Sequence, residues 1–136
     1  GELASTKKPM GSGRTLAERA SGQTAVSSAE ATARSTRAFL HDALGSAWET
    51  ASGGDPLTVE HRRSLRLAAC DAAQRCADAL LLLGREAGGE AVYLREPLQR
   101  AVRDGQVAAT HAMVAPRIHE LTGRLALGLD TDVTLL

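Results

Sequence analysis

The sequence is poor in aromatic side chains, which make up only 2% of its 136 residues. Phe39, Trp48 and Tyr93 are the aromatic residues, and alanine and leucine supply most of the apolar ones. A core built from such small side chains requires closely approaching elements, as between packed helices. The alternation of apolar and polar residues that marks strands is also missing. The length suits one domain.

The chain also lacks a charge excess and a long apolar run. Lysine plus arginine equal aspartate plus glutamate at 16 each, so no net charge attracts a nucleic acid or an anionic membrane. The longest apolar run, Ala79 to Leu83, is far below the roughly 20 residues that cross a bilayer. Residues 1–10 lack the core of a signal peptide. We therefore expect a cytoplasmic protein with neither nucleic acid nor membrane as partner.

Cysteine is scarce as well. Cys70 and Cys76 lie six residues apart in a strongly helical segment, which turns them roughly 120° away from each other. They cannot form a disulfide within one helix. We expect both to be small buried side chains without a redox role.

The sequence contains no usual metal or nucleotide motif. His111 and His119 lie eight residues apart with Pro116 between them, and no Glu-x-x-His pair occurs, so we expect no metal site. His41 and His61 stand among charged residues and are expected on a solvated helix face. Glycine-rich dinucleotide loops, phosphate loops and nucleophile elbows are missing too. The 136-residue chain alone is therefore not expected to be active.

Helical spacing of apolar residues dominates what is present. A helix is predicted from about Gln23 to Thr50, ended by Gly53-Gly54. Its apolar stripe comprises Val26, Ala29, Ala33, Leu40, Leu44 and Ala47. A second helix should start at about Pro56 or Thr58, capped by Asp55, and run to Ala87. Its second half is apolar nearly all round, and such a helix normally lies inside something larger.

Gly88-Gly89 marks the next break, and Pro97 opens a third helix. Pro116 should end or kink that helix near Ala115, and apolar spacing continues to Gly128. Long helices joined by short turns predict an all-α fold, an up-and-down antiparallel four-helix-bundle-like domain. We expect residues 1–22 to be a linker or lead-in with a short helical turn around Leu16, residues 23–128 to form the bundle, and residues 129–136 to be a tail.

Three marks lie between Leu80 and Gly128. Gly88-Gly89 follows a long apolar helix, a Pro-Leu-Gln-Arg segment begins at Pro97, and Arg103-Asp104 precedes His111. As a set they resemble the C-terminal helical domain of the acyl-CoA dehydrogenase superfamily, most closely the branch of flavin-dependent hydroxylases and monooxygenases. The resemblance extends more weakly back to about Lys7. In this family a helical N-terminal domain and a β-domain precede the bundle.

The resemblance implies an oxidoreductase that binds FAD or FMN across the subunits of a homodimer or homotetramer. Gly88 and Gly89 would approach the flavin phosphates, since glycine lets the backbone come close; the alternative is a plain helix C-cap. The sequence departs from the dehydrogenase pattern with Arg85 in place of glutamine and Ala91 in place of a third glycine.

The resemblance also implies that His111 lies beside the flavin ring as acid, base or hydrogen-bond donor. From the residues alone, an alanine-rich helix around His111 suits a core histidine with one hydrogen-bond partner equally well. The catalytic glutamate of acyl-CoA dehydrogenases would fall at Ala112, which cannot take a proton. Arg103 and Asp104 are expected to form a partly buried ion pair that ties the third helix to its neighbours.

The leading hypothesis is a reduced-flavin monooxygenase or hydroxylase with a small-molecule substrate, His111 as catalytic residue and a flavin reductase as partner. One alternative is an acyl-CoA dehydrogenase that holds its base on another helix. The other alternative is a non-enzymatic helical oligomerisation module.

Overall fold

The computed structural model describes residues 2–8, 13–134 and 136, and this part of the chain contains helices and no strand. The predicted all-α class is confirmed. The elements are α1 (Glu2–Thr6), the 3₁₀ helix η1 (Leu16–Glu18), α2 (Ala20–Ser52), α3 (Val59–Ala87), the 3₁₀ helix η2 (Gly88–Val92), α4 (Pro97–Ala109) and α5 (Arg117–Ala126).

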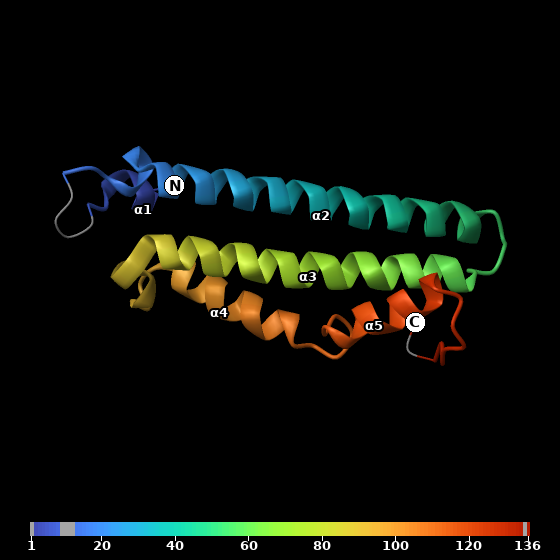
Figure 1. The fold of residues 1–136 in the computed structure, drawn as a ribbon. Helices are drawn as coiled ribbons and strands as arrows, with labels where there is room; N and C mark the ends of the chain where they lie inside the picture. The colour runs from blue at the N-terminus through green and yellow to red at the C-terminus, as the bar shows by residue number, and fades with distance from the viewer. Residues whose placement is uncertain (1, 9–12, 135) are drawn as a thin grey trace.

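The helix α3 is the centre of the fold. Figure 1 shows α2 and α3 side by side and antiparallel, with α4 and α5 following one another along the other side of α3. The main contacts among the long helices join α3 to α2, to α4 and to α5. The chain thus runs up, down and up again, as predicted, and α3 is the helix on which the others pack.

The N-terminal segment contains one element that the sequence did not predict. The short helix α1 precedes the expected helical turn at Leu16, which is present as η1 and buries the Leu16 side chain. The helix α2 then begins at Ala20 rather than Gln23. Residues 9–12 of the predicted lead-in lie outside the described residues.

The face that α2 turns toward α3 differs in part from the predicted stripe. Val26 and Leu44 are 52% and 47% exposed, whereas Ala25 and Ala43, one residue earlier in each case, are buried. Small side chains face α3 because they let the two backbones approach. Larger apolar side chains remain outside. Together with the exposed Ala33 they form what we call the outer strip of α2, which comprises Val26, Ala33, Leu44 and the 74% exposed Trp48.

The turn between α2 and α3 corrects two predictions. Thr58, and not Asp55, caps α3: the Thr58 hydroxyl accepts the His61 N–H at 3.2 Å. His61 is half-buried rather than on a solvated face, since its Nδ1 lies 3.1 Å from the Thr58 hydroxyl and its Nε2 3.3 Å from the Thr50 hydroxyl. The imidazole thereby joins the end of α2 to the start of α3. His41 is exposed, as expected.

The predicted third helix is interrupted earlier than its proline suggests. The helix α4 ends at Ala109, not near Ala115, and α5 begins directly after Pro116. A proline ring clashes with the carbonyl four residues earlier and supplies no N–H to it, and here that residue is Ala112. The helical geometry is therefore lost ahead of Pro116, and residues 110–116, which we call the break, join α4 to α5.

The expected structural ion pair is also different from the prediction. Arg103 Nε lies 3.6 Å from Asp104, and both side chains are more than half exposed. Asp104 also binds Arg100 at 3.2 Å within the same helix. The pair is a surface feature of α4 and does not tie it to a neighbour. No helix of the described residues is long and apolar enough to span a membrane.

Candidate functional site

His111 lies in the break and not on a helix, and its side chain is exposed. The interpretation as a buried core histidine is therefore wrong. Its Nδ1 accepts a hydrogen bond from the Met113 N–H at 3.3 Å, and its carbonyl accepts the Val114 N–H at 2.9 Å. Since Nδ1 acts as an acceptor, the neutral ring carries its proton on Nε2. The imidazole is thus set up as a hydrogen-bond donor through Nε2.

Two side chains of α3 bind the carbonyl groups of the break. Gln74 Nε2 donates to the Ala109 carbonyl at 2.8 Å and to the Val114 carbonyl at 2.9 Å. Cys70, one turn earlier on the same face, directs its Sγ to the carbonyls of Val114 at 3.2 Å and Ala115 at 3.5 Å. These contacts satisfy carbonyls that a continuous helix would have paired with its own N–H groups.

Cys70 is suited to this donor role by its surroundings. It is fully buried, and burial, with the nearby Asp71 charge, raises the pKa of its thiol. The thiol therefore keeps its proton at neutral pH and can donate it to a carbonyl. Cys70 is buried as predicted, whereas Cys76 is only half-buried, and its Sγ lies 3.7 Å from the Thr36 hydroxyl.

The glycine pair lies at the end of α3, where Gly88 is the C-cap and η2 begins. Gly88 has φ +62° and ψ −144°, a conformation that side chains disfavour. The φ of Gly89 is not positive, and a Cβ added at Gly89 would have no neighbouring atom within 4 Å in the described part of the chain. Nothing within this part of the chain thus requires glycine at position 89. Both glycines are exposed, which leaves room for a phosphate group to approach the backbone.

His111 and the glycine pair are not brought together in one chain. Gln74 holds the break, and Gly88 follows Gln74 by 14 positions, which corresponds to roughly 21 Å along the axis of α3. If a flavin phosphate bound at Gly88, the flavin ring could therefore lie beside the His111 of another copy of the chain.

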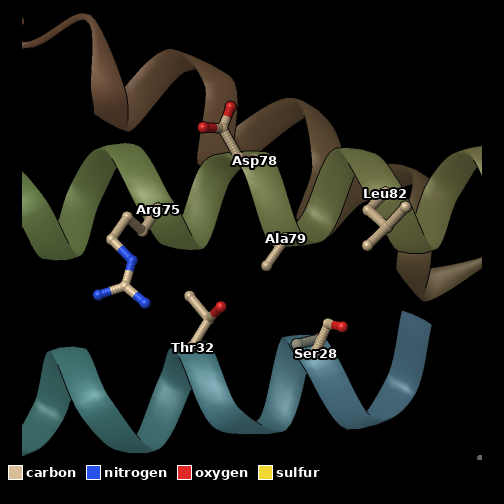
Figure 2. Close-up of a pocket in the computed structure, with 7 residues that line it drawn as sticks. Ser28, Thr32, Arg75, Asp78, Ala79 and Leu82 are labelled. Carbon is tan, nitrogen blue, oxygen red and sulfur yellow. The ribbon is translucent and has the colours of Figure 1, made fainter. Parts of the chain in front are cut away.

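A hollow without any of these residues lies between α2 and α3. It has a volume of about 290 Å³ and is lined by Ser28, Ala29, Thr32, Arg75, Asp78, Ala79 and Leu82. Figure 2 shows Thr32 of α2 directed toward α3 and Ala79 of α3 directed toward α2, so short side chains leave the space unfilled. Arg75 is bound to Asp71 at 3.4 Å and to Ser35 at 3.2 Å. The groove contains none of the predicted site residues.

Among the described residues, no group of three histidine, cysteine, aspartate or glutamate side chains could hold a metal ion. The arrangement that could not be predicted from the sequence is the pair Cys70 and Gln74, which binds the carbonyls of the break. The available signal was a glutamine in the run Ala72-Ala73-Gln74, because a polar side chain on an apolar helix needs a hydrogen-bond partner.

Comparison with known proteins gives a family and two named relatives. A family model described as "Acyl-CoA dehydrogenase, C-terminal domain" matches residues 1–116. An indole-3-acetate monooxygenase from Pseudomonas putida is 34% identical over 113 residues, which are 83% of this chain and 29% of that protein. An indole-3-acetate monooxygenase from Acinetobacter baumannii is 27% identical over 128 residues, which are 94% of this chain and 33% of that protein. The chain thus spans about a third of the length of these relatives.

Proposed function

The chain belongs to the acyl-CoA dehydrogenase C-terminal domain family, and from that premise we propose that it forms the helical C-terminal part of a flavin-dependent monooxygenase. The reaction would consume reduced flavin and dioxygen and yield hydroxylated product, water and oxidised flavin. The similarity to two indole-3-acetate monooxygenases supports this activity. The exposed side chain of His111 in the break is the observation that supports a catalytic residue in this chain.

His111 is the proposed catalytic residue, and its surroundings favour one of its three possible roles. Because Nδ1 accepts the Met113 N–H, a neutral ring has its proton on Nε2, and that nitrogen has no lone pair with which to act as an acceptor. A ring in this state donates a hydrogen bond to an oxygen atom. We therefore infer that His111 acts first as a donor beside the reacting oxygen, rather than as a base toward the substrate.

Gly88 and Gly89 are the proposed flavin-binding residues of this chain. Their open backbone suits an approaching FAD or FMN phosphate, and the separation from His111 suits a flavin shared between copies of the chain. When bound, the flavin supplies the activation of dioxygen; the chain supplies backbone contacts and a donor. The dehydrogenase alternative is less well supported, because Ala112 stands exposed where that chemistry needs a carboxylate.

Substrate and partners follow from the same proposal. The relatives' names favour a small aromatic acid as substrate. A separate flavin reductase would supply the reduced flavin, and both proteins would act in the cytoplasm. None of these partners requires a nucleic acid or a membrane.

Self-association is proposed through the outer strip of α2. Three large apolar side chains on that strip, Val26, Leu44 and Trp48, are about half or more exposed, and an exposed apolar strip on a helix is typical of a protein interface. A second copy packed there would produce a homodimer or homotetramer with closed symmetry.

The test uses the complete protein, by which we mean the longer flavoprotein proposed to contain this chain. His111→Ala should lower hydroxylation at least about 100-fold, as loss of a donor beside a reacting oxygen does, and leave flavin affinity unchanged. His41→Ala, which removes an exposed histidine from α2, is the matched control and should keep full activity. Unchanged turnover in His111→Ala would refute the catalytic role of His111. A complete protein that binds no flavin would refute the proposed monooxygenase function.

A further inference from the structure

Gln74 bridges the two ends of a short loop with a single nitrogen atom. Its Nε2 donates to the carbonyl of Ala109, the last residue of α4, at 2.8 Å and to the carbonyl of Val114 at 2.9 Å. An amide NH₂ group has two protons, so one side chain can serve both acceptors. The distance between Ala109 and Val114, and with it the width of the loop 110–113, is therefore set by Gln74.

The bridge also decides where the backbone N–H groups of the loop go. In a continuous helix the Ala109 carbonyl would accept the Met113 N–H. Here Gln74 takes that place on Ala109, and the Met113 N–H donates instead to His111 Nδ1 at 3.3 Å. The hydrogen bond that orients the imidazole thus depends on the side chain of a different helix.

Cys70 makes a second set of contacts from α3 to the same segment. Its Sγ lies 3.2 Å from the Val114 carbonyl and 3.5 Å from that of Ala115. Cys70 is fully buried, whereas the side chains of His111 and Ala112 are exposed. The inner side of the break is therefore fixed to α3, and its outer side presents the imidazole.

We propose that Gln74 is the positioning residue for His111: it holds the break open on α3 and so directs the imidazole Nε2 outward. The inference rests on the proposed function of His111. Gln74 itself is half-buried and donates to backbone carbonyls of this chain, so its effect on the reaction passes through His111.

The chain offers a matched control for this proposal. Gln106 on α4 donates its Nε2 to the Ala77 carbonyl on α3 at 3.0 Å. It has the same amide chemistry and also joins α4 to α3, but its hydrogen bond goes to Ala77 and not to the break. Gln106→Leu should therefore report the structural cost of losing such a hydrogen bond.

The first experiment measures amide hydrogen exchange of residues 110–114 in the complete protein. Exchange should become at least about tenfold faster in Gln74→Leu, because the protecting hydrogen bonds of Met113 and Val114 open more often, and should stay unchanged in Gln106→Leu. Gln74→Lys keeps donors of similar reach and should restore most of the protection. Equal exchange in the two leucine variants would overturn the proposal without reference to activity.

The second experiment is a double-mutant cycle on hydroxylation. Gln74→Leu should lower kcat on the order of 10- to 100-fold, as a misplaced catalytic group does, with little change in KM. In the His111→Ala background the same substitution should lower kcat less than about twofold, since residues acting as one unit are not additive. An equal loss in both backgrounds would overturn the positioning role. Full turnover in His111→Ala would instead refute the proposed catalytic role of His111, and the exchange result would still decide whether Gln74 orders the break.

Discussion

Alanine substitutions at Gly88 and Gly89 should have different effects, one on folding stability and the other on flavin binding. Gly88 has φ +62° and ψ −144°, so alanine there should destabilise the fold by about 1–3 kcal/mol. Unfolding entropy for 136 residues is roughly 0.3 kcal/mol per kelvin, which converts this loss into a Tm decrease of roughly 3–10 °C. Gly89 has neither a positive φ nor a close neighbour, so Gly89→Ala should change stability by no more than about 0.5 kcal/mol.

The same Gly89→Ala variant should bind flavin more weakly. A Cβ at this position keeps a phosphate away from the backbone, and loss of one hydrogen bond to a charged group costs about 1.5–3 kcal/mol. The flavin Kd of the complete protein should therefore rise about 10- to 150-fold. Gly45→Ala is the control, because a Cβ there also meets nothing and Gly45 lies far along α2.

Thermal unfolding followed by circular dichroism measures the first effect, and an absorbance titration with flavin measures the second. A Gly89→Ala protein that is stable and binds flavin with unchanged affinity would refute a phosphate contact at this glycine. A Gly89→Ala protein that unfolds as readily as Gly88→Ala would refute the structural reasoning that distinguishes the two positions.

Two further predictions concern pH and assembly. The pKa of Cys70 is raised in the fold from its ordinary value of 9.0, so its contribution to stability is complete below that pH and is lost as pH rises through the folded value. Urea unfolding at pH 7 and above pH 9 should show this loss, and Cys70→Ser should reduce it; an identical alkaline loss in both proteins would contradict the assignment. Trp48→Glu on the outer strip should weaken self-association by about 2 kcal/mol or more and leave the helical content unchanged. Sedimentation measures the oligomer, and an unaltered one would exclude the strip as an interface.

The long helices could be predicted because their signals are local. The end of α2 at the glycine pair after Ser52 and the end of α3 at Ala87 follow from glycine positions, and the helical spacing of apolar residues fills the interval. The face of α2 that packs on α3 was harder to predict. Alanines occur on both candidate faces, so apolar spacing could not decide between Ala25 and Val26; the closeness of the two backbones decides it.

The break could be predicted only in part. Pro116 predicts an interruption of the helix, and the clash of its ring with the carbonyl of Ala112 explains why helical geometry is lost ahead of the proline. The residues that stabilise the resulting loop, Cys70 and Gln74, are on another helix and more than thirty residues away in the sequence. Such contacts depend on the packing of α4 and α5 against α3, which no local pattern encodes.

The proposed function requires that the enzyme containing this chain place one oxygen atom of dioxygen in its product. The most direct test supplies the complete protein with reduced flavin, an aromatic acid such as indole-3-acetate and isotopically labelled dioxygen, and measures the product by mass spectrometry. A monooxygenase should give a hydroxylated product that carries one labelled oxygen atom and that fails to form with His111→Ala. A product without the label, or bleaching of bound flavin by an acyl thioester in the absence of oxygen, would contradict the proposed function.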